Sequence, residues 1–261
     1  MPIEFRQGSM PLLISIPHNG SFIPPDIAAT MTEAGRSSRD TDWFLDRLYG
    51  LPATNNASWI IAQQSRYVID LNRPSSGESL YPGQTTTGLV PTECFDGSLI
   101  YQDQEPDAHE IQRRVETVWR PYHAKLASEL KRMVEEFGKA VLIEAHSIKS
   151  VVPRLFEGTL PDFNIGTNRG TSCDASLEEV IMTVLKDQQA YSHVNNGRFV
   201  GGFITRHFGQ PSQHMHAVQI ELSQAAYLNE TDFSWNDAKA NDVQNIFQEL
   251  LSAVVDWSQR A

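Results

Sequence analysis

Two histidines that lie just after apolar runs are the first residues with the chemistry of a site. His18 follows residues 12–16 in the segment PLLISIPHNG, and His146 follows residues 140–145 in AVLIEAH. Apolar runs of this length predict buried strands, and open α/β sheets bind ligands at the carboxyl ends of their strands. Because imidazole is the commonest nitrogen ligand of zinc, two such histidines side by side predict a metal site. For one histidine taken alone, the alternative is a hydrogen bond within a turn at the strand end.

The segment RDTDWFLDRLYG at 39–50 supplies a candidate oxygen ligand. Its apolar residues recur at helical spacing, which predicts a helix with Asp42 and Asp46 one turn apart on the same face. Asp42 is the predicted third metal ligand, and Asp40 and Asp46 are the alternatives. Acids are also favoured in the first turn of a helix by its dipole, which is the structural explanation of the same pattern.

Glu221 lies near the end of a third predicted strand, residues 217–222, whose residues alternate between apolar and polar. A buried acid in such a strand costs free energy unless it has a partner or a task. Two histidines and one carboxylate form a catalytic zinc set with a position left open for water, and zinc lowers the pKa of that water to about 7. A neighbouring glutamate can then act as general base. Together these residue types predict hydrolysis of an amide or an ester.

Arginines at predicted strand ends are candidates for binding an anion. Asn72 and Arg73 follow a predicted strand at 67–71, and Pro74 restricts Arg73 to an extended conformation. The planar guanidinium group suits a carboxylate or an oxyanion. The predicted substrate-binding residues are Asn72, Arg206, Arg154 and Arg169. The alternative for each arginine is a structural salt bridge.

Composition limits the class of partner. The chain has 261 residues and a formal net charge of −11, which argues against nucleic acid and anionic membranes because both need a basic face. The two cysteines form no CxxC pair, and no apolar stretch is long enough to cross a bilayer. The N-terminal residues show no signal-peptide pattern, so a cytoplasmic location is expected.

Alternating strand and helix patterns predict an α/β protein with one domain over residues 1–261. The predicted sheet is mixed and mostly parallel, with helices on both faces. A long helical pattern at 106–138 contains Pro121, which should kink or divide it, and His123, predicted to be an ordinary surface or packing residue. A strand followed by a loop is predicted at 204–209. Residues 74–107 form a long loop, which is often a functional segment such as a lid.

Several motifs carry a resemblance to a known family. They are IPHNG at 16–20, RDTDWFLDRLYG at 39–50, DLNRP at 70–74, EAHS at 144–147, PDFNIGTNRG at 161–170, and TRHFGQP with QIELSQAAYLNE within 205–230. Through these motifs the chain resembles the N-formylglutamate amidohydrolases, or N-formylglutamate deformylases, of histidine degradation. That family is in turn similar to zinc carboxypeptidases and aspartoacylases.

The resemblance implies a zinc-carboxypeptidase-like fold and the hydrolysis of N-formyl-L-glutamate to formate and L-glutamate. It implies that His18, Asp42 and His146 bind zinc and that Glu221 activates water. Arg73 would polarise the formyl oxygen or bind a carboxylate. One departure concerns the acid, because the carboxypeptidase pattern His-x-x-Glu would place it at position 21, where this chain has Ser21.

Other functions remain open at this point. The same residues suit an amidohydrolase for another N-acyl amino acid or a carboxypeptidase-like peptidase. A protein of another class, a non-catalytic binder of small anions, would keep the fold and lose a ligand or the base. A hydrolase with a Ser-His-Asp triad is disfavoured because the chain contains no G-x-S-x-G motif. The sequence does not indicate the oligomeric state.

Overall fold

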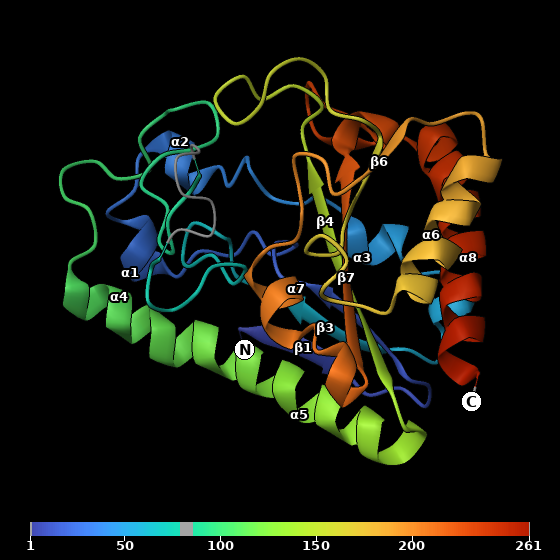
Figure 1. The fold of residues 1–261 in the computed structure, drawn as a ribbon. Helices are drawn as coiled ribbons and strands as arrows, with labels where there is room; N and C mark the ends of the chain where they lie inside the picture. Colours follow the sequence, from blue (N-terminus) through green and yellow to red (C-terminus); the bar gives the residue numbers. More distant parts are fainter. Residues whose placement is uncertain (1, 79–85, 261) are drawn as a thin grey trace.

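The computed structural model describes residues 2–78 and 86–260, and a seven-stranded sheet forms its centre (Figure 1). In spatial order the strands are β1 (Ile3–Arg6), β3 (Ser58–Ala62), β2 (Leu12–Ile16), β4 (Ala140–Ile148), β7 (Met215–Ser223), β5 (Phe163–Gly166) and β6 (His193–Asn195). Four of the six neighbouring pairs are parallel, whereas β1–β3 and β5–β7 are antiparallel. The predicted fold class, a mixed and mostly parallel α/β sheet, is confirmed.

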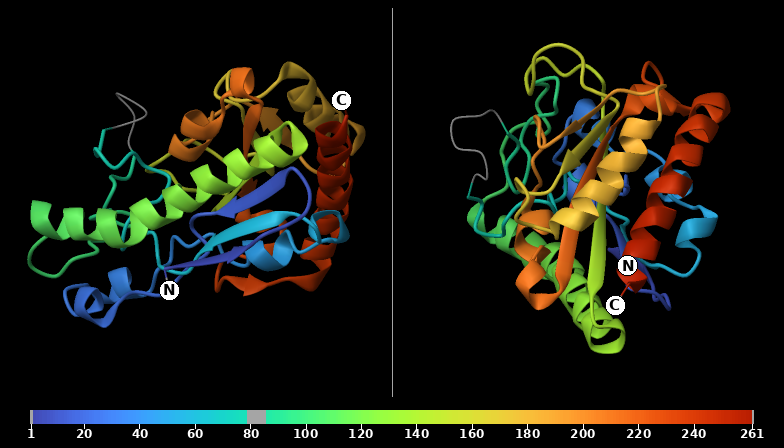
Figure 2. Two further views of the ribbon diagram at one scale, coloured as in Figure 1. Left: turned by 90° about the horizontal axis from the view of Figure 1, so that it is seen from below. Right: turned by 45° about the vertical axis from the view of Figure 1, so that its right-hand side comes forward.

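Helices cover both faces of this sheet (Figures 1 and 2). One face packs against α3 (Leu45–Leu48), α6 (Ala175–Asp187) and α8 (Asp237–Gln259). The other packs against α5 (Arg120–Phe137) and α7 (Phe203–Phe208). The remaining elements are short: α1 (Pro25–Ala28), α2 (Glu33–Arg36), η1 (Pro52–Thr54), η3 (Pro211–Gln213), η4 (Gln224–Ala226), and the paired strands β8 (Leu228–Asn229) and β9 (Ser234–Trp235). Within the described residues, no helix combines the length and the apolar character needed to cross a membrane.

Strand alternation gathers polar side chains at one edge of the sheet. Strands β4 and β7 are parallel neighbours, with Glu144 opposite Gln219 and His146 opposite Glu221. The apolar residues that alternate with them belong to the core under α6 and α8. Because successive side chains of a strand point to opposite faces, these four polar residues share the α5 and α7 face. The register of two central strands therefore places an imidazole and three polar side chains together.

Two predicted strands are wrong. Residues 67–71 are buried but form turns, in which the Val68 amide bonds to the Ser65 carbonyl and the Asp70 amide bonds to the Leu89 carbonyl. Hydrogen bonds outside any sheet thus satisfy the backbone amides of this segment, although its apolar residues alone predict a strand. Residues 204–208 belong to helix α7, because Ile204 and Phe208, four residues apart, bury one face of it.

The predicted helix at 39–49 is also shorter than expected. Helix α3 begins only at Leu45, because Phe44 has a left-handed backbone conformation with φ 60°. Asp42 lies before this break in a buried loop, whereas Asp46 is exposed. The expectation that Asp42 and Asp46 share one helix face is therefore wrong.

The helical pattern at 106–138 is interrupted where Pro121 predicted a break. Helix α4 (Ala108–Arg114) continues through the π-helical turn η2 (Val115–Trp119) into α5. A wide turn is compatible with the proline, which has no amide hydrogen to donate. The end of this turn and the first turn of α5 present two ring nitrogens to the 71–73 segment. Trp119 Nε1 donates to the Arg73 carbonyl at 2.9 Å, and His123 Nε2 lies 2.8 Å from the Leu71 carbonyl.

The buried ring of His123 should make stability depend on pH. Burial lowers the pKa of His123 to about 3, from 6.5 in an exposed histidine. Between these values the unfolded chain binds the extra proton, so stability falls as pH falls, by about 1.4 kcal/mol per unit. We expect His123→Gln to lose less unfolding free energy than the parent between about pH 6 and about pH 5, by about 1 kcal/mol.

Urea unfolding at both pH values measures this difference. The matched control is His109→Gln, which changes an exposed histidine at the start of the same helix. Equal losses in His123→Gln and the parent would show that the His123 ring does not oppose protonation.

Candidate metal site and surrounding pocket

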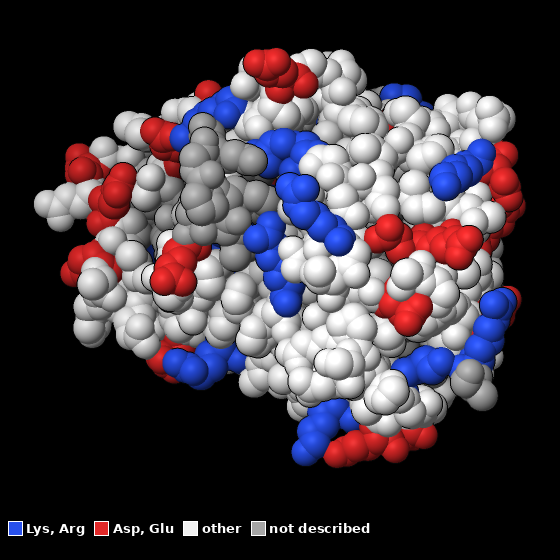
Figure 3. Space-filling model, viewed as in Figure 1, with Lys and Arg blue, Asp and Glu red and all other residues white. Residues whose placement is uncertain are grey.

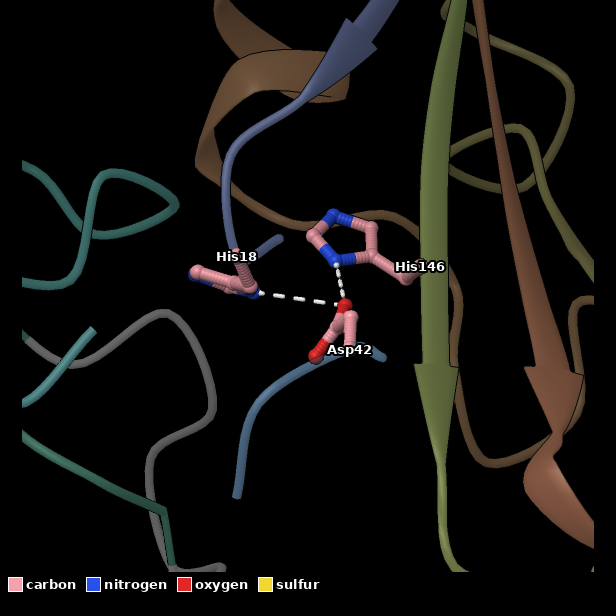
Figure 4. Close-up of side chains that lie close together, drawn as sticks. All are labelled: His18, Asp42 and His146. Carbon is pink, nitrogen blue, oxygen red and sulfur yellow. Dashed lines mark hydrogen bonds and ion pairs between the residues drawn. The ribbon is translucent and has the colours of Figure 1, made fainter. Parts of the chain in front are cut away.

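Three buried side chains from distant parts of the chain meet at the carboxyl end of β2 and β4. Figure 4 shows His18 and His146 both facing the carboxylate of Asp42. Asp42 Oδ2 lies 3.0 Å from His146 Nδ1 and 3.7 Å from His18 Nδ1. The Asp42 loop is fixed to the same edge, since the Asp42 amide bonds to the His18 carbonyl at 3.0 Å. The sequence predicted these three residues as one ligand set, and the fold brings them together.

The opposite nitrogen of each ring is held by a buried carboxylate. His18 Nε2 lies 2.7 Å from Asp70 Oδ1, and His146 Nε2 lies 2.6 Å from Glu144 Oε1. Each Nε2 therefore faces a carboxylate to which it can donate, and each Nδ1 is directed toward Asp42. Among the described residues, His18 Nδ1 is buried without a hydrogen-bond partner. Carboxylates that orient imidazoles in this way are characteristic of metal sites.

The donor set fits a divalent metal ion. One ligand atom from each of His18, Asp42 and His146 lies within 4.8 Å of the other two. Two imidazoles and one carboxylate are the protein ligands of many catalytic zinc sites. The alternative acids lie elsewhere: Asp40 accepts bonds from the Tyr67 hydroxyl and the Phe95 amide, and Asp46 is exposed.

Arg66 balances the two most buried aspartates. Its guanidinium lies 2.9 Å from Asp70 Oδ2 and 3.4 Å from Asp42 Oδ1. Burial favours the neutral carboxyl, but the histidines outweigh it and hold the pKa of Asp42 below its ordinary range. For Asp70, burial is likewise outweighed by His18 and Arg66, and the pKa is lowered. Both aspartates therefore stay ionised in the folded protein.

His146 and Glu221 have strongly shifted pKa values. Burial opposes the charge of His146, but Glu144 and Asp42 outweigh it and raise the pKa of His146 to about 10. Burial raises the pKa of Glu221 to about 7, although the nearby His146 opposes the shift. Glu221 Oε2 accepts a bond from Gln219 Nε2 at 3.1 Å. A carboxyl with this pKa can both take up and release a proton near neutral pH.

A pocket with three arginines adjoins the candidate ligands. Its lining residues are His18, Arg66, Asn72, Arg73, Thr86, Thr87, Phe95, His146, Ile148, Leu155, Arg198, Phe199, Gly202, Gln219 and Glu221. Lys and Arg side chains also gather near the middle of the face drawn in Figure 3. The pocket thus offers local positive charge on a chain whose formal net charge is −11, and local cations of this kind can attract anions.

The predicted arginines fall into two groups. Arg73 lines the pocket beside Asn72, and its Nε donates to the Thr87 carbonyl at 2.9 Å. Three others are absent from the described lining of the pocket. Arg154 bonds to the Cys94 carbonyl and the Glu93 carboxylate, Arg206 Nε bonds to the Gly201 carbonyl, and Arg169 is exposed.

The long loop at 74–107 contributes to the pocket through Thr86 and Thr87. Residues 79–85 of this loop lie outside the described residues, so the expectation that 74–107 is a functional segment, such as a lid, falls partly outside them.

Sequence reasoning missed five residues of the site: Arg66, Asp70, Glu144, Arg198 and Gln219. Glu144 and Gln219 each lie two positions before a predicted site residue in the same strand, so strand alternation alone places them on the site face. Arg66 lies four residues before Asp70, immediately before the segment 67–71 that was wrongly assigned to a strand. No local signal separates Arg198 from the other loop arginines.

The fold and the site define an α/β protein with a candidate metal centre of the type found in hydrolases. The model of the family N-formylglutamate amidohydrolase matches residues 10–228, and the chain belongs to this family. The predicted family is thereby confirmed.

The sequence similarity to known relatives extends along almost the whole chain. The protein is 47% identical over 259 residues to N-formylglutamate deformylase of Pseudomonas aeruginosa, covering 98% of this chain and 97% of that one. It is 46% identical over 257 residues to N-formylglutamate deformylase of Pseudomonas putida, covering 98% and 96%. The crystal structure of N-formylglutamate amidohydrolase from Ralstonia eutropha JMP134 shares the fold, with a TM-score of 0.85, 24% identity and coverage of 99% and 98%.

Removing the Arg66 charge should destabilise the folded protein. In Arg66→Met, the buried carboxylates of Asp42 and Asp70 lose their guanidinium partner. Breaking a buried ion pair from one side costs about 3–5 kcal/mol, so we expect an unfolding free energy lower by this amount.

Urea unfolding in the presence of a chelator measures the effect, since a bound cation would offset the missing charge. Arg120→Met is the control, because Arg120 pairs with Glu116 on the surface and such pairs contribute less than about 1 kcal/mol. A loss in Arg66→Met no larger than in the control would mean that Arg66 does not balance the site.

Proposed function

We propose that this protein is a zinc-dependent amidohydrolase that cleaves N-formyl-L-glutamate to formate and L-glutamate, a reaction of histidine degradation. The observation that carries the proposal is the buried His18–Asp42–His146 set with Glu221 beside it in an arginine-lined pocket. The names of the two Pseudomonas relatives support the substrate.

His18, Asp42 and His146 would hold the metal through Nδ1, a carboxylate oxygen and Nδ1. Zinc bound there would supply a Lewis acid that lowers the pKa of water and polarises the formyl carbonyl. Asp70 and Glu144 keep both histidines in the tautomer that directs Nδ1 to the metal. Arg66 offsets part of the negative charge that these acids accumulate.

Glu221 is the proposed general base. It takes a proton from the attacking water as the new carbon–oxygen bond forms, and it passes the proton to the leaving nitrogen as the carbon–nitrogen bond breaks. The products are formate and the free amine of glutamate. The raised pKa of Glu221 suits both transfers, because neither protonation state is strongly disfavoured near neutral pH.

The pocket arginines are the proposed anchors for the substrate carboxylates. N-formylglutamate carries two carboxylates. Asn72 and Arg73 lie beside each other on the described lining of the pocket. Arg198 also lines it, and its Nε donates to the Leu155 carbonyl. We assign one carboxylate to Asn72 and Arg73 and the other to Arg198. Arg154, Arg169 and Arg206 remain the alternatives predicted from the sequence.

The first test measures metal content and formate release together. We expect about one zinc ion per chain and release of formate from N-formyl-L-glutamate that stops when a chelator removes the metal. Asp42→Ala should lose the metal, whereas Asp46→Ala, which changes the exposed neighbouring acid, should retain it. Glu221→Gln should keep the metal and lower kcat by about 10²–10⁴-fold.

Each outcome has a separate meaning. Bound metal without formate release would retain the site and assign another N-acyl amino acid as substrate. Absence of both metal and turnover after zinc has been supplied would contradict the hydrolase proposal and favour a binder of small anions.

Arg198 is expected to determine the preference for a second carboxylate. In Arg198→Met, kcat/KM for N-formyl-L-glutamate should fall about 10–100-fold, the amount expected for one charge-assisted hydrogen bond. Turnover of N-formyl-L-glutamine, which keeps the α-carboxylate but has an uncharged side chain, should change little. Arg120→Met, a surface arginine outside the pocket, is the control.

Steady-state kinetics on both substrates gives the comparison. If Arg198→Met lost the same factor on both substrates, the residue would not select the carboxylate. A selective loss in Arg154→Met, Arg169→Met or Arg206→Met would transfer that role to the residue changed.

A further inference from the structure

One short turn, residues 201–205, contacts three separate parts of the site. The Gly202 amide donates to Gln219 Oε1 at 2.7 Å, the Ile204 amide donates to Asn72 Oδ1 at 2.9 Å, and the Thr205 amide donates to Glu144 Oε2 at 3.0 Å. The amides in the first turn of a helix have no partner within that helix. In α7 the amides of Ile204 and Thr205 are satisfied by side chains of the site, and that of Phe203 by the Asn72 carbonyl.

The contact with Gln219 leads to Glu221. Because Gln219 Oε1 accepts from Gly202, its Nε2 must face the other way, and it donates to Glu221 Oε2 at 3.1 Å. Gln219 is only 4% exposed, so water is a poor substitute for either bond. Gln219 therefore fixes the carboxylate of the proposed base relative to the turn.

The contact with Glu144 leads to His146. Both the amide and the hydroxyl of Thr205 donate to Glu144 Oε2, and the second oxygen, Oε1, lies 2.6 Å from His146 Nε2. Glu144 has no exposed surface, so its orientation depends on these bonds. Thr205 acts through Glu144 to hold His146 with Nδ1 directed at Asp42.

The turn has no room to shift around Asn72. A Cβ atom at Gly202 would lie 2.2 Å from Asn72 Nδ2, which is far inside contact distance. Asn72 Nδ2 also lies 3.0 Å from His146 Nε2. Close packing of the Asn72 amide on the Gly202 backbone thus joins the substrate pocket to the ligand side of the site.

We infer that Gln219 and Thr205 are positioning residues with separate tasks, both set by the 201–205 turn. Gln219 orients the proposed base Glu221, and Thr205, through Glu144, orients the proposed metal ligand His146. The inference rests on the proposed function: its first part on the proposed catalysis by Glu221, and its second part on the proposed metal site alone.

Two near-isosteric variants separate these tasks. Gln219→Met removes both amide bonds, and we expect kcat to fall about 10–100-fold while KM and the dissociation constant for Zn²⁺ stay within about twofold. Thr205→Val removes only the hydroxyl, and we expect the dissociation constant for Zn²⁺ to rise about tenfold while kcat at saturating Zn²⁺ changes little. Thr205→Ser restores the hydroxyl and should restore the affinity.

Affinity is measured by competition with a chromogenic chelator, and thermal unfolding of the chelator-treated variants measures stability. If both variants lost kcat and Zn²⁺ affinity together, in proportion to lost thermal stability, the turn would be merely structural and the inference would be overturned. If the parent bound Zn²⁺ but did not cleave N-formyl-L-glutamate, the proposed function would fail, and the Thr205 comparison would still decide the inference.

Discussion

The structure depends on keeping four acidic side chains buried at one edge of the sheet. Asp42, Asp70, Glu144 and Glu221 are each at most 7% exposed, and an unpaired buried charge costs more free energy than most single contacts can return. Each acid is therefore tied to specific partners, which come from loops and helices far apart in the chain. Three of the acids contact a ring nitrogen of a histidine directly, and Glu221, the exception, has its pKa raised by burial. That difference in surroundings supports the proposed roles, in which Asp42 binds the metal, Asp70 and Glu144 orient the histidines, and Glu221 transfers protons.

This constraint also explains how a buried acid can be held on an irregular loop. Asp42 has no helix or strand to fix it, yet its neighbours are held on both sides. Gln224 Nε2 donates to the Thr41 carbonyl at 3.0 Å, and the Tyr227 hydroxyl donates to the Trp43 carbonyl at 2.8 Å. The Ser147 amide donates directly to Asp42 Oδ2. A loop bonded at three consecutive residues can position a carboxylate as firmly as regular structure does.

Strand-end chemistry was predictable from the sequence, whereas the partners across the site were not. His18, His146 and Glu221 were found because each lies near the end of a predicted strand, a local signal. The failures at 67–71 and 204–209 have another origin, since in both segments backbone amides bond outside the predicted strand; the Asp70 amide, for instance, bonds to the Leu89 carbonyl. The Ile204 amide bonds to Asn72, which lies 132 positions away, and the Thr205 amide bonds to Glu144, which lies 61 positions away. Local hydrophobic patterns contain no information about such contacts.

The apolar core and the polar site both require the same register between β4 and β7. Each of them therefore stabilises the pairing that the other needs. A slip of one residue between β4 and β7 would turn every side chain of the slipped strand to the opposite face. It would take Val218 and Ile220 out of the core under α6 and α8, and it would bring Glu221 into that core. Apolar burial on one face therefore fixes where the polar residues lie on the other. The buried acids, in turn, contact their partners only in that register. A misregistered sheet would therefore lose stabilising interactions on both of its faces.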